Sequence, residues 1–275
     1  MLRKALLALV LFVAVALSLG FLLLPIVALF TRQPPSELVH QLSNPVVTDA
    51  LVVSVKTSAI AQVLIVLLGT PTAYLIASRR FFGRSLVVTL VELPLVLPPA
   101  VAGIGLLVAF GRVGVLGSTF GALGIDVAFN QAAVVLAVAF VASPLYVRQA
   151  IASFEAVDQN LVAASRTLGA GPVRTFFRVV LPLCGGGLAA GGALSLARGL
   201  GEFGATIMFA GSLQGVTQTL PLAIYAQFDR NFEIAVTISA LFVILTAAIL
   251  LSLKLSSLWP SRQTSGFLFA RLSSS

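Results

Sequence analysis

Long apolar runs, separated by short polar segments, constrain this chain more than any other feature. The first run extends from Ala5 to Phe30, longer than the roughly 20 residues that a helix needs to cross a bilayer. Only 9% of the 275 residues are charged, against about 25% in a soluble domain. Because a backbone in hydrocarbon must satisfy its own hydrogen bonds, such runs predict helices. We expect one all-α membrane domain over residues 1–275, with six spans at about 5–30, 49–78, 86–110, 132–150, 182–209 and 232–253.

The N-terminal run has two interpretations. Its charged start at Arg3-Lys4 and the Ala14-Val15-Ala16 triplet are typical of a cleaved signal peptide. The apolar run continues well past that triplet and is long enough to span a bilayer. We therefore interpret it as a retained first helix.

The distribution of basic residues predicts the orientation. With six spans, both termini lie on one side, and twelve of the 17 Lys and Arg residues fall there. Basic residues mark the cytoplasmic side of a membrane protein. We therefore expect a multi-pass protein of the cell's inner or plasma membrane. Both termini, and the loop at about 154–181, should face the cytoplasm. The net charge of +8 is explained by this orientation and does not indicate nucleic-acid binding. The twelve are Arg3, Lys4, Arg79, Arg80, Arg84, Arg148, Arg166, Arg174, Arg178, Lys254, Arg262 and Arg271.

Several kinds of chemistry are disfavoured by what the sequence lacks. It has one Cys and one His, Cys184 and His40, so we expect no metal site and no catalytic cluster. No Gly is followed by Lys, so the chain has no phosphate loop for ATP. We therefore expect no cofactor in this chain and no membrane-embedded enzyme. A secondary carrier would place ionisable relays along several spans, and only four candidates lie inside spans here. They are Lys56, Glu92, Arg198 and Glu202.

Polar and Pro residues inside spans are candidates for a translocation path or gate. Lys56 either extends to the membrane interface or lines an anion path. Three prolines in the third span break its hydrogen-bond ladder, which makes either a gate or a static bend. Arg198 and Glu202, four residues apart, are either a neutralising ion pair or substrate contacts. Gly187 and Gly191 predict a close helix approach. The candidate path or gate residues are Lys56, Pro98, Pro99, Ser195, Arg198, Glu202 and Thr206.

The segment from Phe154 to Leu183 is the longest polar interruption in the second half of the chain. We expect a helix over about 156–168 and then a turn at Gly169–Pro172, because Gly after a helix and Pro soon afterwards are stop signals. Gly169 is expected to adopt a left-handed conformation there. The segment is either a plain connection or a surface on which a partner docks.

Three motifs in this half of the chain resemble those of a known family. Ala163–Ala170, with Leu181-Pro182 downstream, resembles the EAA loop of ABC importer permeases. Ala163 stands at the family's Glu position, and Ser165 replaces the second Ala. Ala197–Thr206 is similar to the signature of molybdate permeases and, less closely, of sulfate permeases. Thr217–Tyr225 is also similar to the molybdate branch. The first half of the chain resembles the family mainly by hydropathy.

The resemblance implies a type I ABC importer permease fold with a coupling helix that docks in an ATP-hydrolysing subunit. It implies a homodimer, two ATPase subunits that use ATP-Mg, and an extracytoplasmic oxyanion-binding protein. The cargo implied is molybdate or tungstate. A sulfate or thiosulfate permease is the alternative, and an ATP-independent anion carrier is a more distant one. The coupling residues implied are Ala163, Ala164, Ser165, Arg166, Thr167, Leu168, Gly169 and Ala170.

Overall fold

A computed structural model describes residues 2–258, and all regular structure in that range is helical, which confirms the all-α prediction. Arg262 and Arg271, counted above for the orientation, lie outside these residues. The elements are α1 (Leu2–Arg32), α2 (Pro35–Gln41), α3 (Pro45–Ser78), α4 (Arg84–Val96), α5 (Pro99–Phe110), α6 (Gly117–Ala122), α7 (Gln131–Glu155), α8 (Gln159–Thr167), α9 (Pro172–Thr175), a π-helical turn (Phe176–Val180), α10 (Leu181–Leu200), α11 (Gly204–Ala210), α12 (Leu220–Phe228) and α13 (Phe232–Leu258).

Within the described residues, five helical stretches are long and apolar enough to cross a membrane. These are α1, α3, α7, α10 with the turns that lead into it, and α13. The pair α4 and α5 makes a sixth span if it is counted as one, and its two halves are bent by 112°. The bend falls at Leu97, where the extended backbone leads into Pro98 and Pro99. Since proline has no N–H, neither residue can continue the hydrogen-bond ladder of α4.

Several predicted span boundaries were wrong: α3 begins at Pro45 rather than near residue 49, α13 continues to Leu258 rather than ending near 253, and the fourth and fifth spans also differ. The fifth span was expected to run unbroken over 182–209, but α10 ends at Leu200 and α11 begins at Gly204. Gly201 closes α10, and the Glu202 side chain accepts a hydrogen bond from the backbone N–H of Ala205, which starts a new helix. The fourth span was expected to end near residue 150, but α7 continues to Glu155.

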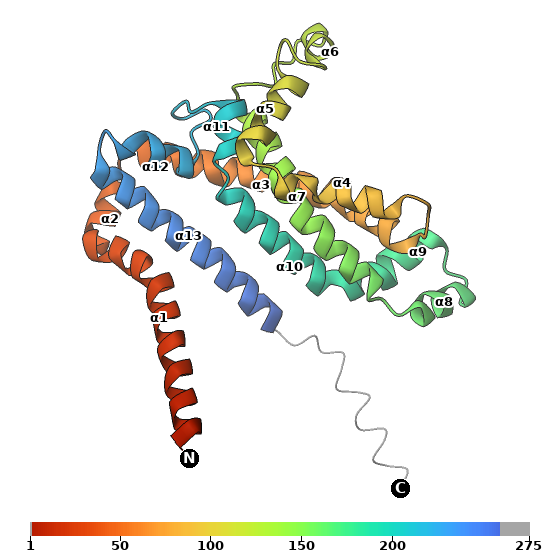
Figure 1. The fold of residues 1–275 in the computed structure, drawn as a ribbon. Coiled ribbons are helices and arrows are strands. Elements are labelled where there is room, and N and C mark those ends of the chain that lie inside the picture. The colour runs from red at the N-terminus through yellow and green to blue at the C-terminus, as the bar shows by residue number, and fades with distance from the viewer. Residues whose placement is uncertain (1, 259–275) are drawn as a thin grey trace.

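The bundle is built around α7, which contacts α3, α10, α4 and α11 (Figure 1). Gly187 and Gly191 lie where α10 crosses α7, and a Cβ atom on Gly191 would come within 2.9 Å of the Gln149 Cβ. The close approach predicted from these two glycines is therefore made between two helices of the same chain.

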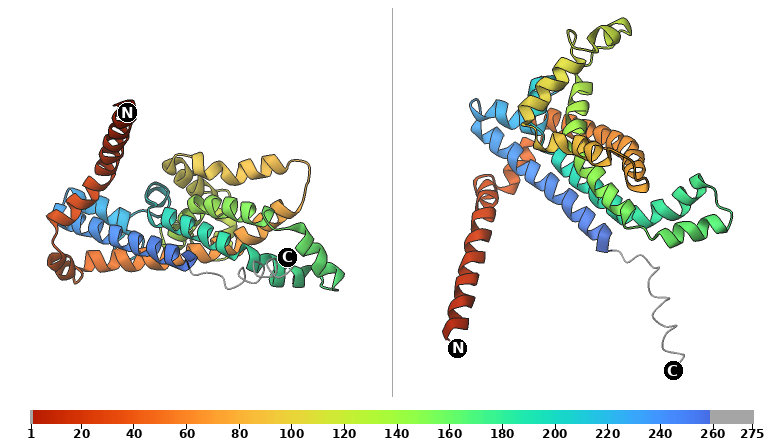
Figure 2. Two further views of the ribbon diagram at one scale, coloured as in Figure 1. Left: turned by 90° about the horizontal axis from the view of Figure 1, so that it is seen from below. Right: turned by 45° about the vertical axis from the view of Figure 1, so that its right-hand side comes forward.

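The first helix stands apart from the rest. α1 projects away from the bundle, and its C-terminal end meets the bundle at the start of α13 (Figures 1 and 2). None of its most apolar stretch is buried, and bulky side chains such as Phe12 and Phe21 are exposed around it. This is the surface expected of a helix surrounded by hydrocarbon.

Candidate coupling and translocation sites

Residues 156–180, which we call the α8–α9 hairpin, leave the bundle after α7 and return to it as α10 (Figure 1). Asp158 has an extended backbone, and its carboxylate accepts a hydrogen bond of 2.9 Å from the N–H of Asn160. This cap starts α8 at Gln159, so the helix predicted from residue 156 begins three residues later.

The turn after α8 has the expected conformation. Gly169 has φ +82°, in the left-handed region, and its N–H donates to the carbonyl of Arg166. Ala170 N–H donates to the carbonyl of Ser165, which ties the turn back onto α8. Gly171, two residues later, has an ordinary φ of −68°. A side chain at Gly169 would therefore strain the backbone, whereas one at Gly171 would not.

Side-chain contacts hold the hairpin together and fix it to the bundle. The hydroxyl oxygens of Ser165 and Thr175 lie 2.7 Å apart, so one of the two residues that depart from the EAA pattern joins the two arms by a hydrogen bond. The Phe176 ring packs against Tyr74 on α3, with centroids 4.6 Å apart, and against Phe154 on α7, at 6.3 Å. The Phe176 ring thus fixes the hairpin to two of the long helices.

The hairpin exposes apolar side chains. Leu168 is 88% exposed, Val173 is also exposed, and so is Phe177 nearer the base of the hairpin. Of the eight predicted coupling residues, only Ser165 and Ala170 are partly covered. An exposed apolar group rimmed by basic residues is typical of a surface that a partner covers. The exposed six are Ala163, Ala164, Arg166, Thr167, Leu168 and Gly169.

The two helix breaks of the bundle meet each other. Pro99, at the start of α5, packs so closely on Gly204, at the start of α11, that a Cβ on Gly204 would lie 2.6 Å from the Pro99 Cβ. A Cβ on Gly103 would lie 2.6 Å from the Ala205 carbonyl oxygen. Only glycine permits these approaches, so α5 and α11 are held together as one unit.

An ion pair spans the break between α10 and α11. Arg198 Nη1 lies 2.8 Å from Glu202 Oε2, and Glu202 Oε1 accepts a 2.8 Å hydrogen bond from Ala205 N–H. The Glu202 side chain is 1% exposed and that of Arg198 is 35% exposed. The buried carboxylate is therefore satisfied on both oxygens, and the open side of the guanidinium keeps donors free for a ligand.

The other candidates are placed apart or lack partners. Ser195 is buried on α10 and its hydroxyl donates to Gln62 Oε1 on α3, a residue that sequence reasoning missed. The Thr206 hydroxyl is fully buried without a hydrogen-bond partner in the described chain. Lys56 lies on the exposed side of α3. The structure thus groups Pro98, Pro99, Glu202 and Thr206 around the α5–α11 unit and does not join Lys56 to them.

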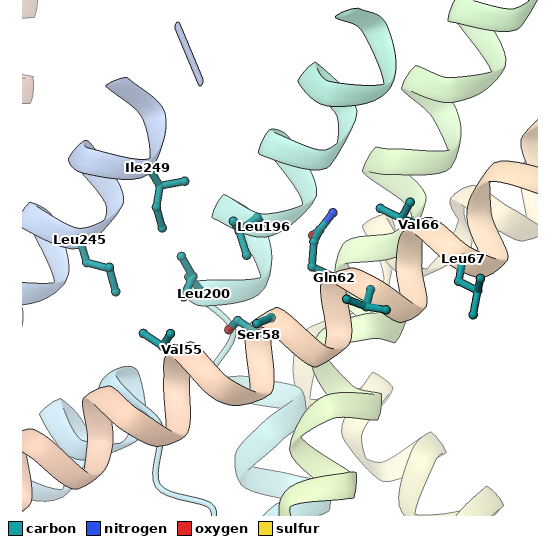
Figure 3. A pocket seen from close by; sticks show the side chains of 11 residues that line it. Val55, Ser58, Gln62, Val66, Leu67, Leu196, Leu200, Leu245 and Ile249 are labelled. Atoms are coloured by element: carbon teal, nitrogen blue, oxygen red, sulfur yellow. The ribbon is translucent and has the colours of Figure 1, made fainter. Parts of the chain in front are cut away.

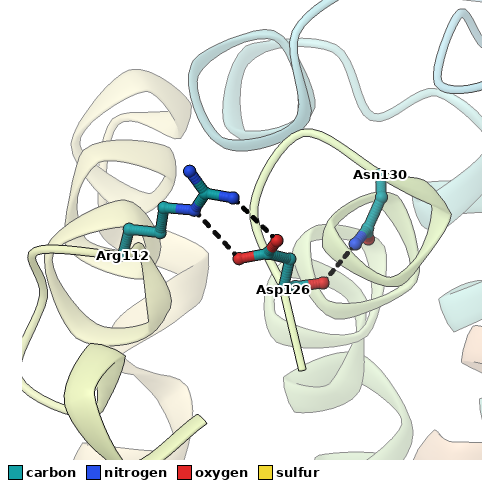
Figure 4. A network of polar contacts seen from close by, with 3 residues as sticks. All are labelled: Arg112, Asp126 and Asn130. Atoms are coloured by element: carbon teal, nitrogen blue, oxygen red, sulfur yellow. Dashed lines mark hydrogen bonds and ion pairs between the residues drawn. The ribbon is translucent and has the colours of Figure 1, made fainter. Parts of the chain in front are cut away.

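Residues 111–130 contain α6 and form a second hairpin, which we call the α6 hairpin. It is held together differently from the α8–α9 hairpin. Arg112 and Asp126 form a two-point ion pair across its base, with distances of 3.1 and 2.9 Å (Figure 4). Hydrogen bonding from Arg112 lowers the pKa of Asp126 below its ordinary value. Asn130 donates to the Asp126 carbonyl oxygen and caps α7 by accepting from the N–H of Ala132.

A cavity of about 750 Å³ opens between α3, α10 and α13, and its labelled lining is almost wholly aliphatic (Figure 3). Ser58 and Gln62 are its polar members. A hydrated oxyanion would lose its water there without gaining enough donors, so the cavity suits an apolar occupant. Within residues 2–258, no three His, Cys, Asp or Glu side chains are grouped to hold a metal ion.

A bundle with broken spans and a protruding, exposed hairpin is an architecture that fits a membrane transport protein. The chain belongs to the family of binding-protein-dependent transport system inner membrane components, which matches residues 65–259. It is 47% identical over 234 residues to the molybdenum transport system permease protein ModB of Mycobacterium tuberculosis, covering 84% of this chain and 88% of that protein. It is 38% identical to the probable transport system permease protein NifC of Clostridium pasteurianum, covering 88% and 85%.

Solved structures show the same fold. A bacterial ABC transporter that imports alginate matches with a TM-score of 0.70 at 17% identity, over 93% of this chain and 96% of that one. The MetNI methionine ABC transporter matches with a TM-score of 0.56 at 20% identity, over 77% and 92%. The expected ABC importer permease fold is therefore confirmed.

Proposed function

We propose that this chain is the membrane-spanning subunit of an ABC importer that moves molybdate into the cytoplasm. The observation that carries the proposal is the 47% identity, over most of both chains, to permeases named for molybdenum transport. The motif resemblances at Ala197–Thr206 and Thr217–Tyr225 agree with it. Tungstate, which has nearly the same size and charge, would follow the same path.

A separate ATPase subunit supplies the energy. Two copies of this chain would pair with two ATPases on the cytoplasmic side and with an extracytoplasmic binding protein that delivers the anion. The exposed apolar side chains of Leu168 and Val173 at the tip of the α8–α9 hairpin, with Phe177 nearer its base, support its docking in a groove of the ATPase. ATP-Mg is bound by that partner, since this chain has no phosphate loop.

The eight residues 163–170 would then be the coupling helix and its turn. The basic bias of the sequence supports a cytoplasmic location for this hairpin and for both termini. When the ATPases close on ATP, the two hairpins approach each other and the path opens outward to receive the anion. Hydrolysis resets it inward.

The anion path would run beside the α5–α11 unit. Arg198 supplies a positive charge that attracts the anion. Glu202 weakens this attraction by partly neutralising the charge, which suits a site that must release its ligand. The prolines at the break supply the bend. Thr206 supplies a hydroxyl without a partner in the described chain, and Ser195 positions Gln62 of α3 by its hydrogen bond. Lys56 would act as a separate positive group along α3.

The test is uptake. Cells that lack this chain should lose high-affinity molybdate uptake and keep sulfate uptake near normal, and the restored chain should recover it. Proteoliposomes that contain this chain, its ATPase and the binding protein should take up molybdate only with ATP. Loss of sulfate uptake alone would assign the chain to sulfate transport, and uptake without ATPase would make it a secondary carrier.

A further inference from the structure

Four charged side chains face one another between α4 and α7. Arg84 and Glu155 form an ion pair at one end of this contact, and Arg148 Nε lies 3.6 Å from Glu92 Oε1 further along it. Neither pair belongs to the hairpin or path sites described above. The cleft that they border measures about 260 Å³, and its other lining residues are Val88, Val91, Ile151 and Ala152.

The spacing of the charges fixes how the helices align. Arg84 and Glu92 are eight residues apart on α4, and Arg148 and Glu155 are seven apart on α7. With a rise of 1.5 Å per residue, these separations are about 12 and about 10 Å. On both helices the Arg precedes the Glu in the sequence, so both pairs form only when the helices run antiparallel in this register. A slide of two turns would bring Arg84 beside Arg148, and their like charges would repel.

Arg84 also joins three elements at one point. Its Nε donates a 2.9 Å hydrogen bond to the Ile76 carbonyl oxygen in the last turns of α3. It is the first residue of α4. Its partner Glu155 is the last residue of α7, three residues before the Asp158 cap of α8. The contact therefore lies where the α8–α9 hairpin leaves the bundle.

The other end of α4 leads to the helix break. α4 runs 13 residues from Arg84 to Val96, and Pro99, three residues further on, packs on α11. Pro94 removes one backbone N–H from α4, but the helix continues through it to Val96 and so joins its Arg84 end to the break. A continuous line of contacts thus runs from the base of the hairpin to the α5–α11 unit.

We propose that the Arg84–Glu155 and Glu92–Arg148 pairs clamp α4 to α7, so that movement of the hairpin carries the break at Pro98 with it. This inference rests on the proposed function and deepens it by naming the residues through which ATP hydrolysis reaches the path. The Arg84 and Glu155 side chains are 35% and 47% exposed. Ion pairs this open add little to stability, so what they contribute is the register of the two helices.

The test compares uptake with hydrolysis in the same vesicles. The wild-type complex and its variants are reconstituted with the ATPase and the binding protein, and molybdate taken up per ATP hydrolysed is measured. Arg84→Glu places two carboxylates opposite each other, so the ratio should fall by about fivefold while hydrolysis continues. Glu155→Arg, which places two guanidinium groups opposite each other, should lower the ratio in the same way. The double variant Arg84→Glu, Glu155→Arg restores opposite charges and should return to within about twofold of wild type.

Arg80→Glu is the matched control, because it makes the same charge change in the same basic turn and Arg80 has no ion pair in the described chain. Its ratio should stay normal. A normal ratio in Arg84→Glu, or no recovery in the double variant, overturns the clamp. If the wild-type complex itself shows no ATP-driven molybdate uptake, the proposed function fails instead. If reversed charges prevent insertion, Arg84→Gln and Glu155→Gln take their place.

A cross-link gives an independent measurement. Val88 and Ile151 line the same cleft from opposite helices. Both can be changed to Cys in a Cys184→Ala chain and joined by a short bifunctional thiol reagent. If α4 and α7 move together, the cross-linked importer should keep its uptake. Loss of uptake on cross-linking, with no loss in either single Cys variant treated alike, would show that the helices move apart and would contradict the proposal.

Discussion

The α8–α9 hairpin and the α6 hairpin both protrude from the bundle and expose apolar side chains, yet they are held differently. The α6 hairpin is closed onto itself by the Arg112–Asp126 pair. The α8–α9 hairpin has no ion pair of its own and is fixed by the Phe176 ring to Tyr74 and Phe154 on two long helices. A segment whose side chains pack among the long helices can pass its movement to them. A segment whose strongest contact joins its own two ends can move without displacing those helices. The contrast supports the proposed role of the α8–α9 hairpin as the transmitter of movement and gives the α6 hairpin no such role.

The first test of this comparison asks whether the two hairpins lie on opposite sides of the membrane. Cys184 is buried, so single Cys substitutions at exposed Ser118 and Thr167 can be labelled selectively. In intact cells or right-side-out vesicles, an impermeant thiol reagent should label Ser118→Cys and leave Thr167→Cys unlabelled until the membrane is opened. Labelling of both from outside would contradict the proposed topology. Untreated wild type is the control.

Strain at the tip of the transmitter should have the largest effect on transport. A β-branched residue at φ +82° costs about 1–3 kcal/mol, so Gly169→Val should lower molybdate uptake about tenfold or more while the chain still inserts. Gly169→Asp should be milder, because Asp tolerates this conformation better. Gly171→Val is the matched control, since that glycine has an ordinary φ and open space around it. Equal effects of the two Val variants would show that the turn geometry is unimportant.

Loosening the anchor should have an intermediate effect. Phe176→Ala removes a half-buried ring from its contacts with Tyr74 and Phe154, which should destabilise the detergent-solubilised chain by about 2 kcal/mol. Uptake per ATP should fall, because the hairpin no longer moves with α3 and α7. Phe177→Ala, at an exposed neighbouring ring, should leave thermal stability nearly unchanged. Unchanged stability in Phe176→Ala would refute the anchoring role.

The smallest effect is expected in the α6 hairpin. Because Arg112 lowers the pKa of Asp126, the pair contributes stability above the ordinary carboxyl pKa of 3.8 and loses it as pH falls through the lowered pKa. The amide hydrogen-exchange rates of residues 111–130, corrected for the intrinsic rate at each pH, should therefore change little between pH 8 and pH 5. They should rise in stronger acid. Asp126→Asn should remove that acid dependence and leave uptake near wild type. A large transport defect in this variant would give the hairpin a transmitting role.

The sequence predicted local features better than distant pairings. The left-handed turn at Gly169 was predictable because Gly and the Pro that follows constrain it locally. The bend of the third span was predictable from its prolines, but its 112° angle depends on how α5 packs on α11. The break after Leu200 was missed, although Gly199 and Gly201 bracket it, since glycines are common in membrane helices. The Arg84–Glu155 pair joins residues 71 apart, and only the packing of α4 on α7 brings them together.

The π-helical turn at Phe176–Val180 sets the direction in which the hairpin points. A π turn holds one more residue than the α-helical turn that it replaces. Each residue of an α-helix turns the chain by about 100°, so removing one residue here would swing everything before it around the axis of α10 by roughly that angle. The Phe176 ring would leave its aromatic neighbours, and the exposed tip would face a different quarter of the membrane surface. The one extra residue in this turn therefore determines the direction in which the hairpin points. A chain without it would present its docking surface from a differently rotated helix.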